Sequence, residues 1–369
     1  MMNCELFITF ASVLSVFFER MQEQISQTGR QPLLPVGTLL QGGRYRIDGH
    51  LSSGGFGNTY VATNMEYGVQ VAIKEFSLRD TVQNEDDTCV VVRTVSQKEL
   101  FAQQRAKFRK EANRMHQLHN EHIVNVYQLF EENGTAYYEM DLIHGESLDE
   151  RLKRSSQPLD EREVVGILDQ VLDGLAAVHE QHLVHLDLKP ANIMMDERGR
   201  AMLIDFGASK HVSDGQTSSV PSMMLFTPQY SPLEQIDQNL KNFGPWTDFY
   251  ALGATLYRLL TLQSPPTATE RLEERAELTF PPHVSAPMQS LIAWMMQLGR
   301  MDRPQNTSEI KQYLYANFQS YFFVAPAPEP AYVVPPQPAK KTPTCLIVLA
   351  FVLALVLTVI LLLVFLVVL

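Results

Sequence analysis

The chain has 369 residues, of which 45% are hydrophobic, so it can bury one large two-lobed domain or two smaller ones. Its formal net charge of −11 argues against nucleic acid as a main partner. The three cysteines, Cys4, Cys89 and Cys345, lie far apart and form neither a disulfide framework nor a zinc-binding spacing, which favours a reducing compartment.

Residues 1–44 are predicted to form an extension before the folded domain. Leu6–Phe18 is apolar, but it is short for a membrane span and lacks the basic residues and cleavage site of a signal peptide. The sequence leaves two interpretations open: translation starts at Met21, or the segment is an amphipathic or packed helix. Prolines and glycines make the remainder irregular, namely Pro32, Pro35, Gly42 and Gly43.

A glycine-rich turn, Ser52–Tyr60, lies between two predicted strands, Tyr45–Leu51 and Val71–Lys74. Glycines let a backbone approach phosphate oxygens closely and point its N–H groups at them. Taken alone, such a turn is more often a simple hairpin, and a lysine that ends a strand is more often a surface group. The rest of the chain decides between these interpretations.

A helix is predicted after a long polar segment. The segment Ser77–Gln97 contains an acidic turn, and a solvated loop is its simplest interpretation. Apolar residues then recur at the spacing of a helix, at Phe101, Phe108, Ala112 and Met115.

Two strands and a second helix follow. Ile123–Phe130 and Ala136–Leu142 are strand-like and are joined by a short polar turn. Pro158 and Asp160 open a long helix whose apolar stripe is typical of a core-facing helix. The stripe consists of Val164, Leu168, Val171, Leu172, Leu175 and Val178.

Four polar residues near a predicted hairpin carry the strongest chemical signal. Asn192 and Asp205 offer hard oxygen ligands of the kind that magnesium prefers. Asp187 can accept a hydrogen bond from an attacking hydroxyl, and Lys189 places a positive charge beside a bound anion. Such a hairpin, with acidic and amide groups at its base, can hold a metal over a phosphate.

The order and spacing of these residues resemble the eukaryotic-like serine/threonine protein kinase superfamily, in which an Asp…Asn catalytic loop precedes Asp-Phe-Gly. The resemblance covers about Tyr45–Phe318. It implies an α+β, two-lobed kinase fold with a β-rich N-lobe, residues 45–141, and a helical C-lobe, residues 142–320. It also implies transfer of the ATP γ-phosphoryl to Ser/Thr hydroxyls of proteins, with Mg²⁺ or Mn²⁺ held by Asn192 and Asp205.

The resemblance assigns catalytic roles to four residues. Lys74 is expected to orient the α- and β-phosphates and to pair with Glu111 on the helix that follows. Asp187 is expected to accept the hydroxyl proton, and Lys189 to steady the transferring group. The predicted ATP-binding residues are Leu51, Ser52, Ser53, Gly54, Gly55, Phe56, Gly57, Asn58, Thr59, Ala72, Lys74, Met140, Asp141, Ile143 and Met194.

The residues after Asp-Phe-Gly resemble an activation segment. Its predicted end contains Thr227, which marks Ser/Thr specificity, and Glu234, which is expected to form a buried pair with Arg303. Asp248 resembles the buried carboxylate that braces the catalytic loop. Autophosphorylation is predicted at Thr217, Ser218 and Ser219.

Several positions depart from the family pattern. Leu186 replaces the arginine that binds a phosphate on the activation segment in relatives. We therefore expect activity that does not depend on binding of that phosphate. Ser52 replaces the first glycine of the turn, and Pro232-Leu233 replaces Ala-Pro. These departures leave a membrane-tethered pseudokinase scaffold as an alternative. A small-molecule kinase is a third interpretation, which the resemblance of Thr227–Glu234 to a protein-substrate platform disfavours.

The C-terminal residues predict a membrane anchor. Residues 321–344 are rich in proline and are predicted to form a semi-rigid linker. Residues 345–369 contain no charged residue and are long enough to cross a bilayer as a helix. Lys340 and Lys341 precede this stretch, so the positive-inside rule places the kinase domain in the cytoplasm of a single-pass membrane protein.

Overall fold

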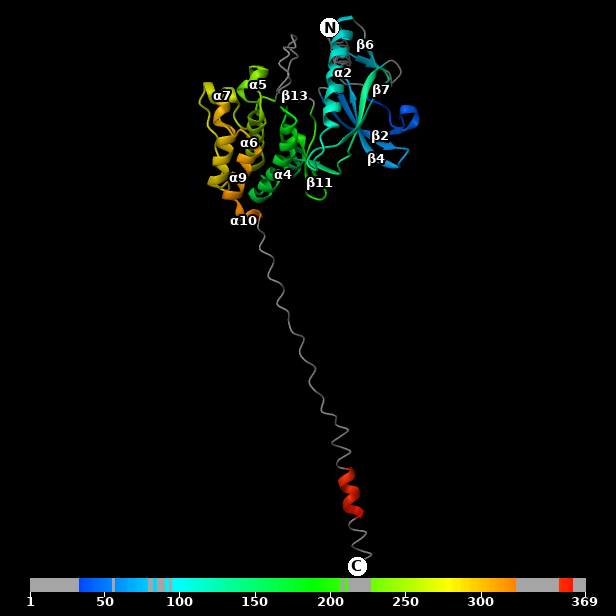
Figure 1. Ribbon diagram of the computed structural model, residues 1–369, viewed down its shortest axis with the longest axis vertical. Helices are drawn as coiled ribbons and strands as arrows, with labels where there is room; N and C mark the ends of the chain where they lie inside the picture. The colour runs from blue at the N-terminus through cyan, green and yellow to red at the C-terminus, as the bar shows by residue number, and fades with distance from the viewer. Residues whose placement is uncertain are drawn as a thin grey trace, which may run out of the picture. The chain divides into compact units, whose positions relative to one another are not determined.

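The computed structural model describes residues 33–54, 57–78, 82–84, 90–92, 95–206, 210–211, 227–322 and 352–360. The chain divides into two units, 1–322 and 323–369, and Figure 1 labels the elements of the first.

The second unit contributes one described helix, residues 352–360. Within the described residues, no helix combines the length and apolar character needed to cross a bilayer. The rest of the predicted anchor, 345–369, and most of the predicted linker, 321–344, lie outside the described residues.

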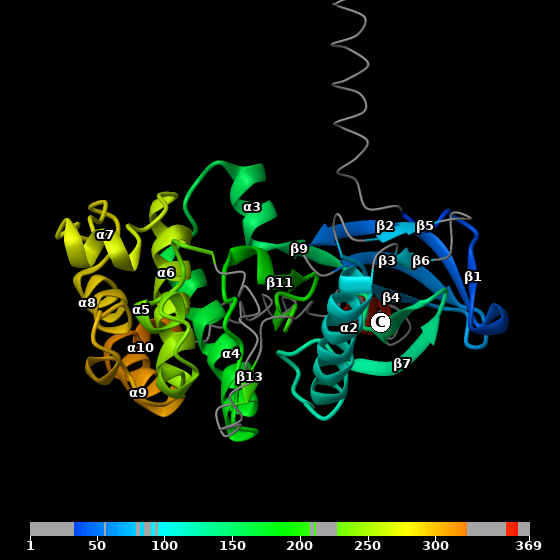
Figure 2. The ribbon, with the colours of Figure 1, turned by 90° about the horizontal axis from the view of Figure 1, so that it is seen from above.

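An antiparallel six-stranded sheet forms the N-lobe, with strand order β1-β2-β3-β4-β8-β7 (Figure 2). Helix α2 (Val95–Met115) packs on one face through Phe101 and Phe108, which contact Phe76 of the sheet. The strands are β1 (Leu39–Leu40), β2 (Tyr45–Gly54), β3 (Gly57–Asn64), β4 (Val69–Phe76), β7 (Val126–Glu132) and β8 (Thr135–Met140).

Residues of the predicted N-terminal extension cover the other face of the sheet. Leu34 and Leu40 are buried there in a cluster with Tyr45, Tyr60 and Tyr137. The folded lobe therefore begins before residue 45. Because both faces are covered, five of the six residues of β8 are buried.

The predicted loop 77–97 contains a short ribbon in its described part. Strands β5 (Val82–Asn84) and β6 (Val90–Val92) pair antiparallel. Residues 79–81, 85–89 and 93–94 lie outside the described residues.

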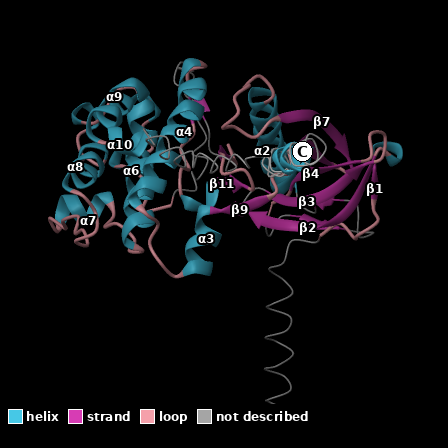
Figure 3. Ribbon diagram, turned by 90° about the horizontal axis from the view of Figure 1, so that it is seen from below, coloured by secondary structure: helices cyan, strands magenta, loops and turns pink. Residues whose placement is uncertain are grey.

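The C-lobe is helical, in contrast to the strand-rich N-lobe (Figure 3). Asp160 caps α4 (Glu161–Glu180) by accepting a hydrogen bond from the Arg162 N–H, as its place in the sequence predicts. All six residues of the predicted apolar stripe are buried. The other helices are α3 (Leu148–Ser155), α5 (Leu233–Ile236), α6 (Pro245–Thr261), α7 (Ala268–Glu273), α8 (Ala286–Met295), α9 (Thr307–Asn317) and α10 (Gln319–Phe322).

Short strands of the C-lobe flank the predicted catalytic loop. Strands β9 (Gly145–Ser147), β11 (Ile193–Asp196) and β12 (Ala201–Leu203) form a sheet in the order β12-β11-β9. Strand β10 (Leu183–Val184) pairs with β13 (Lys210–His211). The β11–β12 pair is the hairpin expected between Asn192 and Asp205.

Candidate active site

The catalytic loop between β10 and β11 is held from behind by a buried carboxylate on α6. Asp248 Oδ2 accepts hydrogen bonds from the His185 N–H at 2.9 Å and from His179 Nε2 at 2.8 Å. Its Oδ1 accepts from the Leu186 N–H at 2.8 Å. The helix therefore fixes the backbone immediately before Asp187, as the sequence predicts for Asp248.

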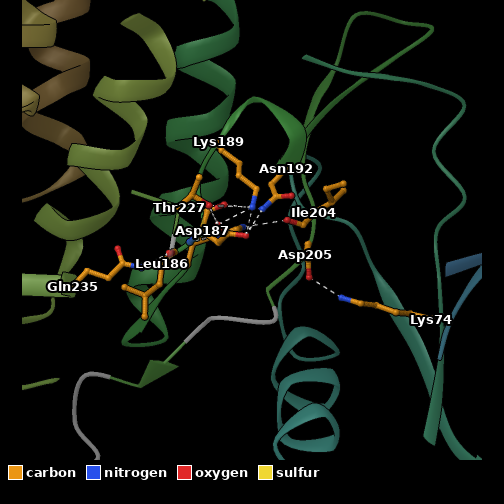
Figure 4. A network of polar contacts seen from close by, with 10 residues as sticks. Lys74, Leu186, Asp187, Lys189, Asn192, Ile204, Asp205, Thr227 and Gln235 are labelled. Atoms are coloured by element: carbon orange, nitrogen blue, oxygen red, sulfur yellow. Dashed lines mark hydrogen bonds and ion pairs between the residues drawn. The ribbon is translucent and has the colours of Figure 1, made fainter. Parts of the chain in front are cut away.

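Asp187 lies at the centre of a hydrogen-bonded cluster (Figure 4). Lys189 Nζ donates to both of its carboxylate oxygens, at 3.0 and 2.8 Å. Asn192 Nδ2 donates to Oδ2 at 2.9 Å, and Thr227 Oγ1 to Oδ1 at 3.3 Å. The side chain of Asp187 is 22% exposed, so a hydroxyl from outside can reach it. The structure thus brings together four residues that lie up to 40 positions apart.

A second cluster joins the two lobes. Lys74 Nζ on β4 lies 2.6 Å from Asp205 Oδ1 of the C-lobe and 3.9 Å from Glu111 Oε1 on α2 (Figure 4 draws the first contact). Asp205 has a positive φ of 60°, and its side chain is 44% exposed. The carboxylate is therefore both paired with Lys74 and open to solvent.

The charged groups of this second cluster shift one another's pKa values. Burial alone would lower the pKa of the Lys74 ammonium, but the negative charges of Asp205 and Glu111 hold that pKa well above its ordinary value. Burial raises the pKa of the Glu111 carboxyl to about 7, and the Lys74 ammonium opposes part of that rise. Lys74 therefore stays charged at neutral pH.

The predicted glycine-rich loop connects β2 and β3. Gly57 has a φ of 149°, and an added Cβ there would lie 1.7 Å from the Glu75 carbonyl oxygen, so only glycine fits. Ser53 Oγ donates to Asn58 Oδ1 at 2.7 Å, which ties the two strands together beside the turn. The predicted ATP-binding residues Gly55 and Phe56 lie outside the described residues.

Further predicted ATP-binding residues come from both lobes. Ala72 on β4 pairs in register with Met140 on β8. Met194 lies on β11, and Ile143 lies between the lobes, packed against the core. The carboxylate of Asp141 accepts hydrogen bonds from the backbone N–H and the side-chain Nδ2 of Asn125 and from Tyr127 Oη, which fixes the chain where it leaves the N-lobe.

The predicted ion pair between Glu234 and Arg303 is present in the structure. Arg303 Nη1 lies 2.7 Å from Glu234 Oε1, and Arg303 Nη2 lies 3.2 Å from Oε2. Both side chains are buried. The predicted autophosphorylation sites Thr217, Ser218 and Ser219 lie outside the described residues.

One contact to the catalytic loop has no signal in the sequence. Gln235 Nε2 on α5 donates to the Leu186 carbonyl oxygen at 2.7 Å (Figure 4). The side chain of Leu186 is buried with Val184 and Phe243 in a small apolar cluster. Leu186 is thus held at its N–H, its carbonyl and its side chain, and its φ is 66°.

The donor set fits a magnesium nucleotide. Asn192 and Asp205 supply amide and carboxylate oxygens, which are hard ligands, and Mg²⁺ is usually held by few protein groups together with water and phosphate. Among the described residues, no group of three or more His, Cys, Asp or Glu side chains is arranged to hold a metal alone. These two oxygen donors suit a metal that completes its coordination with phosphate and water.

Comparisons with known proteins agree with this geometry. Residues 45–316 match the family described as "Protein kinase domain". "Probable serine/threonine-protein kinase pknA2" of Bifidobacterium longum is 32% identical over 223 residues, which cover 60% of this chain and 27% of that protein. "Serine/threonine-protein kinase PrkC" of Bacillus subtilis is 31% identical over 223 residues, with 60% and 31% covered.

A solved structure, "PpkA-294 apo form", has a TM-score of 0.68 and 26% identity, with 77% of this chain and 100% of that chain covered. The chain spans about a quarter to a third of the length of these two curated relatives. Since the family match covers most of the chain and the two-lobed fold agrees with it, the chain belongs to the protein kinase domain family.

Proposed function

We propose that this protein is a serine/threonine protein kinase that transfers the γ-phosphoryl of ATP to protein hydroxyls. The observation that carries this proposal is the single cluster formed by Asp187, Lys189, Asn192 and Thr227. The Lys74–Asp205 contact between the lobes adds the group expected to orient the phosphates. The names of the relatives support the same activity.

In the proposed mechanism, Asp187 accepts the proton of the attacking hydroxyl. Lys189, already bonded to Asp187, steadies the negative charge of the transferring group, and Lys74 orients the phosphates. Asn192 and Asp205 would hold magnesium, or manganese, which supplies neutralisation of phosphate charge when it is bound. Thr227, bonded to Asp187, helps place the acceptor hydroxyl.

Phosphosite mapping tests the proposal. The purified full chain is incubated with labelled ATP, magnesium and a generic protein, and label is expected on serine and threonine. The membrane-tethered pseudokinase scaffold, which the Leu186 departure favours, predicts no label above that of the Asp187→Asn chain. Label confined to a small molecule would instead favour a small-molecule kinase.

Activity is proposed to be independent of activation-segment phosphorylation. Leu186 brings no guanidinium to the loop; instead, Asp248 and Gln235 hold its backbone and Val184 and Phe243 surround its side chain. The combined replacement of Thr217, Ser218 and Ser219 by alanine is therefore expected to leave kcat close to that of the unaltered chain, as measured by steady-state phosphorylation. A fall of several orders of magnitude would contradict this independence.

We also propose that residues 345–369 anchor the protein in a membrane with the kinase domain in the cytoplasm. The absence of charge in this stretch and the two lysines before it support the proposal. Cell fractionation of the full chain and of a chain that ends at residue 344 tests it. An equal distribution of the two between membrane and soluble fractions would argue against an anchor.

A further inference from the structure

The peptide unit between Leu186 and Asp187 is held by two hydrogen bonds of unequal length. A peptide unit is planar, so the Leu186 carbonyl and the Asp187 N–H turn together. The carbonyl oxygen accepts from Gln235 Nε2 at 2.7 Å (Figure 4). The N–H donates to His185 Nδ1 at 3.4 Å, which is long for a hydrogen bond. The shorter of the two bonds therefore comes from α5, outside the catalytic loop.

This peptide unit needs support because the residue before it has an unfavourable backbone conformation. Leu186 has a φ of 66°, in the left-handed region that a leucine rarely adopts. Asp248 of α6 fixes the N–H of Leu186, but that bond lies on the other side of the Cα and does not hold the carbonyl. Rotation about the Cα–C bond of Leu186 would move the backbone of Asp187 and redirect its carboxylate. The bond from Gln235 opposes this rotation.

Helix α5 is itself fixed to the C-lobe beside Gln235. The preceding residue, Glu234, is buried and pairs with Arg303 at 2.7 Å. Glu234 Oε1 also accepts from Thr247 Oγ1 at 3.1 Å. The backbone N–H of Gln235 donates to the Pro232 carbonyl oxygen at 3.0 Å. The side chain that reaches the catalytic loop therefore projects from an anchored segment.

Packing alone does not account for an amide at this position. Gln235 is 2% exposed, and a buried amide costs free energy unless it is hydrogen bonded. A methionine has a similar length and volume and would fill the space without that cost. The bond to Leu186 offsets the cost and satisfies the carbonyl of a residue that is itself buried.

We propose that Gln235 is a positioning residue for phosphoryl transfer, whose side-chain amide fixes the Leu186–Asp187 peptide unit and thereby sets the direction of the Asp187 carboxylate. The inference rests on the proposed kinase activity. Lys189 and Asn192 also bind this carboxylate, but they belong to the same loop and move with it. Gln235 ties the loop to a separate helix.

Gln235→Met removes the donor and keeps the length of the side chain. In the full chain it is expected to lower kcat by roughly tenfold to a hundredfold, because the Leu186 carbonyl loses its partner and the Asp187 carboxylate loses its direction. The KM for ATP is expected to change little, since Lys74 and Asp205 are not altered. Turnover is normalised to the folded fraction measured by circular dichroism.

Gln289→Met is the matched control. Gln289 Nε2 on α8 donates to the Val284 carbonyl oxygen at 2.8 Å, so this variant also loses an amide-to-carbonyl bond, but one made next to α8. It is expected to keep kcat. Gln235→Asn keeps an amide that is one methylene too short to reach Leu186. It is expected to show the same loss as Gln235→Met and replaces that variant if the methionine chain does not fold.

A double-mutant cycle separates positioning from general stability. In the Asp187→Asn chain the proposed base is already absent, so Gln235→Met is expected to change the residual kcat by no more than about twofold. A loss of equal size with and without Asp187, or an equal loss in the Gln235→Met and Gln289→Met chains, would overturn the positioning role. The same holds if an active chain is unaffected by Gln235→Met. An unaltered chain without turnover would overturn the proposed kinase activity itself, and this inference with it.

Discussion

Asp187→Asn is expected to lower kcat by roughly 10²–10⁴-fold while nucleotide binding is retained. The amide has the shape of the carboxylate and can still accept a hydrogen bond from Lys189, but it cannot take the proton of an attacking hydroxyl. Lys74 and Asp205, the groups expected at the phosphates and metal, are not altered. Steady-state phosphorylation measures kcat, and titration with a fluorescent nucleotide measures binding.

The matched control for this substitution is Asp149→Asn. Asp149 pairs with Lys153 on the surface of α3, at 2.6 Å, and is assigned no role in the reaction. Its replacement is expected to leave both measurements unchanged. Unchanged turnover in the Asp187→Asn chain would remove the proposed base from the mechanism.

Arg303→Met is expected to destabilise the C-lobe by about 3–5 kcal/mol, because it leaves the buried carboxylate of Glu234 without its counter-charge. The guanidinium also donates to the carbonyl oxygens of Gln297, Leu298 and Trp246, which lose these donors. A loss of this size corresponds to a fall in Tm of roughly 10 °C, measurable by thermal unfolding.

Arg154→Met provides the control for burial. Arg154 makes a two-oxygen contact with Glu146, at 2.6 and 3.0 Å, but its side chain is 68% exposed. Exposed pairs contribute about 0–1 kcal/mol, so its loss is expected to change Tm little. Equal decreases in Tm in the two variants would show that burial of the Arg303–Glu234 pair adds nothing to its contribution to stability.

The catalytic cluster could be predicted because its residues lie close together in the sequence. Asp187, Lys189 and Asn192 occupy one short loop, and the β11–β12 hairpin returns the chain to Asp205, so their order and spacing carry the family resemblance on which the prediction depends. The Glu234–Arg303 pair spans 69 positions and came only from the family resemblance. The role of every residue in the reaction stays a prediction.

Other features could not be predicted because they depend on tertiary placement. Tyr137 and Tyr138 are chemically identical neighbours, and only the pairing of β8 with β4 decides which of them meets Lys74. Likewise, nothing in the composition of residues 33–44 marks Leu34 as part of the N-lobe core. The polar character of Gln235 gave no indication of its carbonyl partner 49 positions earlier in the chain.

The left-handed backbone of Leu186 links catalysis to the cohesion of the C-lobe. This conformation costs a leucine about 1–2 kcal/mol. It persists because Asp248 on α6 binds the Leu186 N–H and Gln235 on α5 binds the Leu186 carbonyl oxygen. A change that weakens the packing of either helix therefore lets the backbone of Leu186 relax, directly beside Asp187, before the rest of the C-lobe unfolds. In this chain, activity should decline at temperatures below the onset of global melting.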